Sequence, residues 1–187
     1  FRKMAIHKFL NKIEDGAKII DLGCGSGISL KQILLECNKR INLVGVDGSK
    51  DSLRRARRIL EEVYNKASNP LVKMNARRTK LVECDLRRGF PKGKYDVVFM
   101  SLLVNHIPED RRYGFFNNVK KILKDKGVVV VYQIINKSKF ERAPMWVMHV
   151  VPTHQEYPFK DEYIRMLKTI FREVKYYLDG TIVVAMN

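Results

Sequence analysis

The chain has 187 residues, of which 45% are hydrophobic and 30% are charged. This length is typical of one domain of roughly 100–200 residues, so we expect a single domain over residues 1–187, and the composition excludes disordered and fibrous classes of protein. There are 36 Lys and Arg residues against 20 Asp and Glu, a net charge of +16. Such an excess favours a polyanionic partner as the first hypothesis.

The cysteines and the apolar runs indicate the compartment. Cys24, Cys37 and Cys84 are odd in number, and their spacing matches neither a disulfide framework nor a CxxC metal motif. We therefore expect a reducing, cytoplasmic location. The longest nearly unbroken apolar run, residues 128–135, is far shorter than the roughly 20 residues of a membrane span. No membrane span and no secretory signal are expected in this chain, which begins at Phe1.

In the first half of the chain, helical and strand patterns alternate. Residues 1–13 space their apolar side chains as an amphipathic helix does. The apolar run 17–22 predicts a strand, and a glycine-rich turn and a helix follow it directly. Further strands are predicted at 41–47 and 79–84, with a helix at about 50–64 between them.

The second half continues the alternation. A buried strand is predicted at 95–100, a helix from about 109 to 125, a Val-rich strand at 127–134 and a helix at about 160–170. This order predicts an α/β fold with a doubly wound, mostly parallel sheet and helices on both faces.

The C-terminal residues favour an antiparallel end to the sheet. Two strand-like runs, 174–178 and 181–186, flank Asp179–Gly180, a preferred two-residue hairpin turn. With this hairpin the predicted sheet has seven strands. The two long irregular stretches are 65–78 and 136–158, and long loops in compact domains are usually functional or mobile.

A glycine-rich run, DLGCGSG at residues 21–27, lies between a predicted strand and a predicted helix. Glycines there let the backbone turn sharply and approach a ligand, and the helix N-terminus offers free N–H groups to it. A dinucleotide-binding fingerprint requires GxGxxG, but counting from Gly23 its last glycine falls on Ile28. This spacing weakens the interpretation as a nicotinamide nucleotide site.

Two carboxylates follow neighbouring strands. Asp47 ends the second predicted strand, where a carboxylate can accept hydrogen bonds from both hydroxyls of a ribose. Asp85 follows the third predicted strand, within reach of an adenine amino group. With the glycine-rich run, they describe a site for an adenosine that carries a polar tail.

At these motifs the sequence resembles the class I S-adenosylmethionine-dependent methyltransferases. DLGCGSG resembles their first motif, VGVDGS the second, ECDL the third and KYDVVFMSLLVNHIPED the fourth with its following helix. The resemblance extends from about residue 17 to 135, and the closing hairpin fits the antiparallel last strand of that family. It implies a Rossmann-like fold, S-adenosylmethionine as cofactor with S-adenosylhomocysteine as product, and methyl transfer as the activity.

The resemblance also implies roles for single residues. Asp21 would orient the methionine amino group through the loop, Asp47 would bind the ribose and Asp85 would meet the adenine. Ser101 and Leu102, at the end of the fourth strand, would face the methyl group and the acceptor. The expected cofactor-binding set is Asp21, Gly23, Cys24, Gly25, Gly27, Asp47, Gly48, Ser49, Asp85, Leu86, Ser101 and Leu102.

Several of these residues have a second interpretation. An Asp after a strand, such as Asp85, is also an ordinary helix cap, and Cys24 can be a small packing residue rather than a nucleophile. If the acceptor is a hydroxyl or a protonated amine, a histidine can take its proton. The candidate bases are His106, His149 and His154. The competing interpretation of His106 is that it caps or packs before Pro108.

The segment after the fourth strand bears on the acceptor. Residues 101–107 lack the Asn/Asp-Pro-Pro-Tyr/Phe run of amino-directed DNA and protein-glutamine methyltransferases, and the chain has no Pro-Cys nucleophile for cytosine C5 chemistry. The metal-binding glutamates of the small-RNA 2′-O-methyltransferases are also missing, so no metal is expected. Residues 136–158, with Trp146 and several Met and aromatic side chains, are predicted to form an acceptor-side lid or insertion, or to pack under their own loop.

The positive charge is concentrated in residues 50–94, which hold 14 basic and 5 acidic residues. If the third strand lies at an edge, this basic surface flanks the adenosine end of the site, and it contains only Tyr64 and Phe90 as aromatics. We expect a methyltransferase with a small-molecule acceptor. Two alternatives stay open: an RNA or tRNA methyltransferase that uses the basic surface, and a non-catalytic cofactor-binding partner subunit. The oligomeric state is not predicted.

Overall fold

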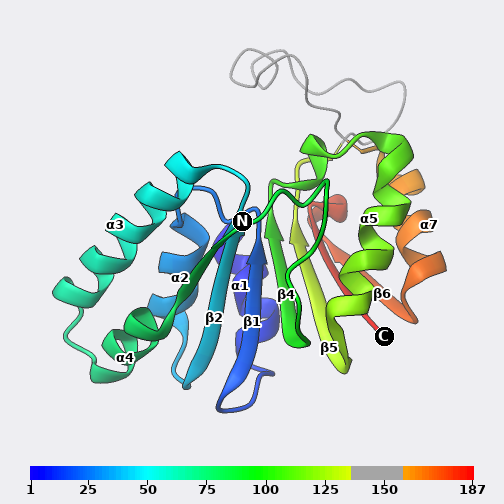
Figure 1. The fold of residues 1–187 in the computed structure, drawn as a ribbon. Coiled ribbons are helices and arrows are strands. Elements are labelled where there is room, and N and C mark those ends of the chain that lie inside the picture. The colour runs from blue at the N-terminus through cyan, green and yellow to red at the C-terminus, as the bar shows by residue number, and fades with distance from the viewer. Residues whose placement is uncertain (136–157) are drawn as a thin grey trace.

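The computed structural model describes residues 1–135 and 158–187. One seven-stranded sheet, in the order β3-β2-β1-β4-β5-β7-β6, forms the centre of the molecule (Figure 1). Its strands are β1 (Ala17–Leu22), β2 (Ile41–Asp47), β3 (Lys80–Glu83), β4 (Tyr95–Ser101), β5 (Leu123–Tyr132), β6 (Glu173–Tyr177) and β7 (Ile182–Met186). The first five strands are parallel, and β7 is antiparallel to both β5 and β6. The predicted fold class is confirmed.

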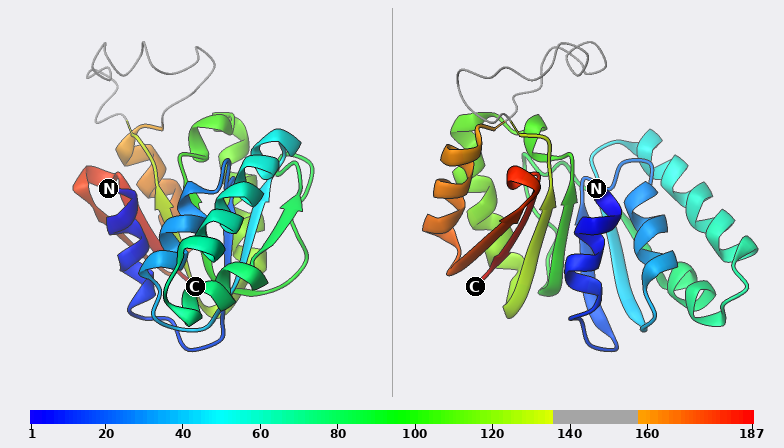
Figure 2. Two further views of the ribbon diagram at one scale, coloured as in Figure 1. Left: turned by 90° about the vertical axis from the view of Figure 1, so that its left-hand side faces the viewer. Right: turned by 180° about the vertical axis from the view of Figure 1, so that it is seen from behind.

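Helices cover both faces of the sheet (Figures 1 and 2). One face carries α1 (Arg2–Leu10), α2 (Ile28–Glu36), α3 (Lys50–Lys66) and α4 (Pro70–Arg78), and the other carries α5 (Glu109–Ile122) and α7 (Lys160–Ile170). Two short 3-10 turns, η1 (Val104–His106) and η2 (Leu178–Gly180), follow β4 and β6. None of the helices in the described part of the chain has the length and apolar character of a membrane span.

The core consists of two buried clusters, one on each face of the sheet. Neighbouring residues of β1 serve different clusters, because successive side chains of a strand point to opposite faces: Ile19 belongs to one and Ile20 to the other. On the α1 side, Phe9 packs on Phe99 of β4 with ring centroids 5.8 Å apart. The central strands β1 and β4 are therefore buried on both faces, as their nearly continuous apolar runs predict, whereas the edge strand β3 stays partly exposed.

Helix α4 corrects the prediction of an irregular stretch at 65–78. The Oδ1 atom of Asn69 accepts a hydrogen bond from the Leu71 N–H at 2.9 Å, and Pro70 occupies the first turn. These are an N-cap and a favoured first-turn residue, and they start the helix. Val72 and Ala76, one turn apart, are the apolar residues that it buries.

The predicted two-residue hairpin turn is also wrong, although the antiparallel pairing is confirmed. Tyr177 pairs with Ile182, so residues 178–181 form a four-residue connection that contains η2. Leu178, Asp179 and Gly180 all have positive φ, and a Cβ on Gly180 would lie 2.6 Å from Ile135. Packing against the end of β5 thus selects a wider turn than the Asp-Gly pair alone indicates.

Two helix boundaries differ from the prediction. Helix α5 ends at Ile122 rather than near 125, because β5 starts at Leu123 and crosses an irregularity in its pairing with β4 before Val128. Helix α1 is shorter than the predicted residues 1–13, with Phe1 and Met4 exposed and Ile6 buried instead. Of the predicted lid at 136–158, only Pro158 lies within the described residues, and it is buried.

Candidate functional site

The motifs found in the sequence meet at the carboxyl edge of the sheet. Strand β1 lies between β2 and β4, so the strand order reverses beside it. In open α/β sheets, ligands bind at such a switch point, outside the carboxyl ends of the strands. A cavity of about 440 Å³ opens there, lined by residues that follow β1, β2, β3 and β4.

The glycine-rich loop after β1 needs its glycines. Gly23, Gly25 and Gly27 have φ angles of +69°, +53° and +87°, a region that favours glycine. A Cβ on Gly23 would lie 2.7 Å from the Leu103 side chain, and one on Gly27 would lie 3.0 Å from Ala56 of α3. The loop is therefore in close contact with both α3 and the segment after β4.

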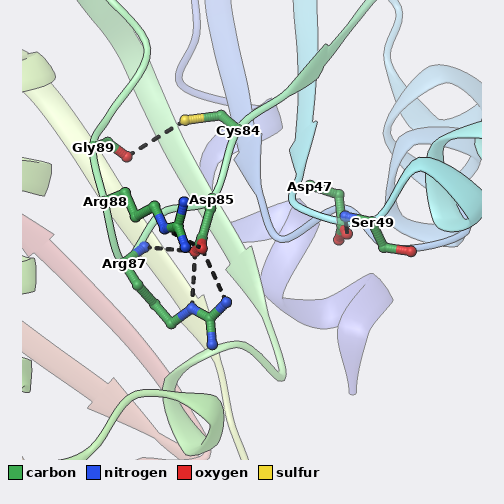
Figure 3. Close-up of polar contacts among 7 residues, drawn as sticks. All are labelled: Asp47, Ser49, Cys84, Asp85, Arg87, Arg88 and Gly89. Atoms are coloured by element: carbon green, nitrogen blue, oxygen red, sulfur yellow. Dashed lines mark hydrogen bonds and ion pairs between the residues drawn. The ribbon is translucent and has the colours of Figure 1, made fainter.

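Asp47 connects this loop to the end of β2. Its Oδ2 atom accepts a hydrogen bond from the Gly25 N–H and its Oδ1 atom accepts one from the Ser49 N–H, each at 2.9 Å. Ser49 in turn caps α3, its hydroxyl accepting from the Ser52 N–H at 3.2 Å. Figure 3 shows Asp47 beside Ser49. Asp47 lines the cavity, and each carboxylate oxygen keeps a lone pair for a ligand hydroxyl.

Asp21, at the end of β1, is the most unusual group of the site. Its side chain is fully buried, and neither carboxylate oxygen has a hydrogen-bond partner among the residues that the structure describes. Burial raises its pKa well above the ordinary value, the cation of Arg2 lowers it, and the nearby Asp47 raises it further. An unpaired buried carboxylate is costly to folding, and Asp21 is not among the residues that line the cavity.

Asp85 lines the cavity but is already engaged. The Nε and Nη2 atoms of Arg87 donate to its two oxygens, each at 2.9 Å, and Arg88 lies 3.6 Å away (Figure 3). The side-chain and backbone hydrogen bonds from Arg87 lower the pKa of Asp85 to about 2. Any adenine amino group that binds Asp85 must share the carboxylate with this guanidinium.

The segment after β4 places its residues differently from the prediction. Leu103, rather than Ser101 or Leu102, lines the cavity. Leu102 has a positive φ of 57° and donates its N–H to Tyr132. Ser101 accepts a hydrogen bond at 2.9 Å from the Nε atom of Arg2, so α1 reaches the carboxyl edge of β4.

Some residues of the expected cofactor-binding set line the cavity, and the others are not part of its lining. The lining members are Gly23, Asp47, Gly48, Asp85 and Leu86. Cys24 is buried, and burial raises the pKa of its thiol well above the ordinary value, which makes it a poor nucleophile and fits the packing interpretation. Cys24, Cys37 and Cys84 are all free thiols.

One candidate base can be placed. His106 lines the cavity as part of η1, where its own N–H donates to the Leu103 carbonyl. His149 and His154 lie outside the described residues. Which histidine acts as a base stays a prediction.

Sequence reasoning missed two supporting residues. Gln133, fully buried at the end of β5, accepts from the Val104 N–H and donates to Asn105, each at 3.1 Å, and so fixes η1. Its polarity within a Val-rich run was an available signal. The sequence around Arg2 carried no such signal, because only the packing of α1 brings this residue to β4.

The comparison with known families agrees with this geometry. Residues 19–127 match the model of a methyltransferase domain. The chain belongs to this methyltransferase family. The resemblance found in the sequence is thus confirmed, and with it, at the level of the family, the expectation of S-adenosylmethionine as cofactor.

Individual methyltransferases resemble parts of the chain. Trans-aconitate 2-methyltransferase of Azoarcus sp. (strain BH72) is 30% identical over 97 residues, 52% of this chain and 32% of that protein. Phosphatidylethanolamine N-methyltransferase of Cereibacter sphaeroides is 28% identical over 130 residues, 70% of this chain and 55% of that protein. The chain thus spans about a third to about half of these curated relatives.

Solved structures share the fold. The structure of Haemonchus contortus phospholethanolamine N-methyltransferase 2 in complex with phosphomonomethylethanolamine and S-adenosylhomocysteine superposes with a TM-score of 0.70 at 21% identity, covering 93% of this chain and 37% of that one. At this identity the likeness supports the methyltransferase fold.

The described residues fit the family's cofactor. The glycine-rich loop leaves room for close approach of a ligand: a Cβ on Gly25 would meet no atom within 4 Å. Asp47 offers carboxylate oxygens to a ribose, and Asp85 and Leu86 lie at the far end of the cavity from the loop's own strand. The lining thus offers acceptors for the nucleoside part of the cofactor.

Proposed function

We propose that the protein transfers a methyl group from S-adenosylmethionine to a small-molecule acceptor. The observation that carries the proposal is the cavity at the carboxyl edge of the sheet, which is lined by Gly23 of the positive-φ glycine loop and by the carboxylates of Asp47 and Asp85. Membership of the methyltransferase family supports the same reaction. Bound at this edge, the cofactor supplies an electrophilic methyl group on a sulfonium.

The residues of the chain bind the cofactor and orient it. Asp47 would accept hydrogen bonds from the ribose hydroxyls, the bare backbone at Gly23 would allow close approach of the cofactor, and the buried Asp21 would orient the methionine amino group through the loop. Such a methyl transfer depends mainly on alignment of the nucleophile and on exclusion of water. His106, which lines the cavity, is the described candidate for taking a proton from the acceptor.

A small acceptor is favoured by the relatives. The names of two of them specify trans-aconitate and phosphatidylethanolamine as acceptors, and neither is a nucleic acid. The arginines of α3 and α4 lie at the β3 end of the sheet, where β2 and β1 separate them from Ser101 at the end of β4, whereas Arg87 of the same basic segment lines the cavity. An RNA bound to α3 and α4 would need to reach across two strands to place an acceptor at the end of β4.

Calorimetry with S-adenosylhomocysteine tests the cofactor site. We expect binding to the wild type, binding weakened at least about tenfold in Asp47→Ala, which removes a charged acceptor worth roughly 1.5–3 kcal/mol, and weaker binding in Asp21→Asn, which removes the charge beneath the loop. The matched control is Asp96→Asn, which removes a carboxylate that pairs with Lys124 at 2.8 Å and begins β4 at the opposite edge. No binding to the wild type, or equal binding to all four proteins, contradicts the proposed site.

Transfer of a labelled methyl group to a metabolite extract or to total RNA distinguishes the acceptor classes. We expect label in the metabolite fraction. Label in RNA alone would support the RNA alternative, and tight cofactor binding without label in either fraction would support a non-catalytic partner subunit.

A further inference from the structure

A second hollow lies at the β3 edge, apart from the cofactor cavity. It has a volume of about 480 Å³, and its lining comes from α3, α4, Thr79 and the start of β3. The side chains that matter for its chemistry are Arg57, Glu61, Tyr64, Asn65, Arg77 and Thr79. We call this hollow the edge groove; it shares no lining residue with the cofactor cavity.

The cations of the edge groove are not neutralised. Arg57 of α3 and Arg77 of α4 are exposed, and neither forms an ion pair with any residue that the structure describes. By contrast, Arg54 pairs with Asp51 and Lys66 pairs with Glu62 on the same helix, α3. Two guanidinium groups on facing helices are suited to bind successive phosphates, because each can donate two parallel hydrogen bonds.

An aromatic ring lines the same groove as these cations. Tyr64 lines the edge groove and is 38% exposed, and the Nζ atom of Lys73 lies 5.8 Å from its ring centroid. An exposed ring beside cations is what single-stranded nucleic acids use, since a base stacks on the ring while its phosphates contact the cations. The large hydrophobic side chains exposed on α3, α4 and β3 are limited, among the described residues, to this tyrosine, so the apolar side chains with which a surface inserts into lipid are missing.

Glu61 supplies the edge groove with a hydrogen-bond acceptor. Its carboxylate lines the groove with Arg57 and Arg77, and it repels phosphates as well as carboxylates, so it does not by itself favour a nucleic acid over an acidic peptide. A ribose 2′-hydroxyl, however, can donate a hydrogen bond to it, and this hydroxyl separates RNA from DNA.

We propose that the edge groove binds single-stranded RNA, with phosphates on Arg57 and Arg77, a base stacked on Tyr64 and a 2′-hydroxyl donating to Glu61. This binding is separate from the methyl-transfer site and does not depend on the identity of the methyl acceptor.

Fluorescence anisotropy with a labelled oligouridylate tests the phosphate contacts. We expect the wild type to bind it, and Arg57→Gln/Arg77→Gln to bind at least about tenfold more weakly. The slope of log affinity against log salt should also flatten by about 1.4, because each phosphate contact on a single strand contributes about 0.7. The matched control, Arg165→Gln/Lys168→Gln, removes two exposed charges from α7 on the other face and should leave affinity and slope nearly unchanged.

The same assay tests the stacking contact. Tyr64→Ala should weaken binding at least about fivefold, the lower end of a base–aromatic stack, and Tyr64→Phe should restore it. Calorimetry with S-adenosylhomocysteine, expected to be the same for all these variants, shows that they are folded and separates this test from that of the proposed function.

Three results would overturn the proposal: no binding of the oligouridylate, equal binding by the Arg57→Gln/Arg77→Gln variant, or equal affinity for the matching deoxyribonucleotide oligomer. Stronger binding of polyglutamate or of phosphatidylglycerol vesicles would assign the groove to an acidic protein or to a membrane surface instead.

Discussion

At the scale of single residues, Asp85 shows how a predicted ligand group can be present and yet engaged. Arg87 holds both of its oxygens, and the lowered pKa means that the pair persists until the pH falls toward about 2. The pair therefore contributes to stability in a defined pH range. Its contribution is fully present above 3.8, the pKa of the unfolded carboxyl, and is lost as the pH falls through the pKa of the folded state.

Removing Arg87 should therefore release Asp85 for the ligand. We expect Arg87→Ala to bind S-adenosylhomocysteine roughly 2- to 10-fold more tightly, the worth of one neutral hydrogen bond. Calorimetry measures it, with Arg88→Ala as control, because Arg88 lies 3.6 Å from the carboxylate and makes the weaker contact. Weaker binding by Arg87→Ala would show instead that this arginine contacts the adenosine.

The sequence predicted the carboxylates of the site better than their partners. Asp21 and Asp47 end strands that the apolar runs mark clearly, so the sheet itself brings them together. The contact of Arg2 with Ser101 joins residues 99 positions apart and depends on how α1 packs. No local pattern encodes such a contact.

At the scale of elements, the long buried strands were predictable and α4 was not. A run such as residues 128–131 is apolar throughout because both faces of β5 are covered. Helix α4 fully buries only Val72, Asn75 and Ala76, and its other apolar residues, such as Leu71 and Met74, are half-buried, so its apolar periodicity is weak. Its start is encoded by the Asn69–Pro70 pair rather than by an apolar stripe.

The N-cap of α4 gives a direct test. We expect Asn69→Ala to lower the free energy of unfolding by about 1 kcal/mol, the usual cost of a lost N-cap. Chemical denaturation measures this. Asn65→Ala serves as control, because Asn65 is exposed within α3 and makes no side-chain hydrogen bond to the residues described in the structure; a change within about 0.5 kcal/mol is expected there. Equal losses in both variants would contradict the cap.

At the scale of the whole molecule, the buried Asp21 lowers the stability of the fold while it serves the binding of a ligand. Its raised pKa means that ionisation at neutral pH costs folding free energy. For a carboxyl raised in the folded state, this cost is absent below the unfolded value of 3.8 and grows as the pH rises above it, up to the folded pKa.

Asp21→Asn should therefore be more stable than the wild type although it binds the cofactor product more weakly. Without ligand, we expect a higher free energy of unfolding at pH 7, because the amide avoids the cost of burying an unpaired charge. The gain should shrink as the pH falls toward 4. Thermal and denaturant unfolding at several pH values measure it; a loss of stability at pH 7 would show that the buried amide is worse than the carboxylate.

The two hydrogen bonds of Asp47 have a consequence for how a ligand enters. They fix the loop after β1 and the start of α3 in one conformation before any ligand is present. The conformational entropy of ordering that wall is lost during folding, so none of the binding free energy is consumed in arranging it. The pocket is in this respect a rigid receptor, preorganised by one carboxylate at its rim.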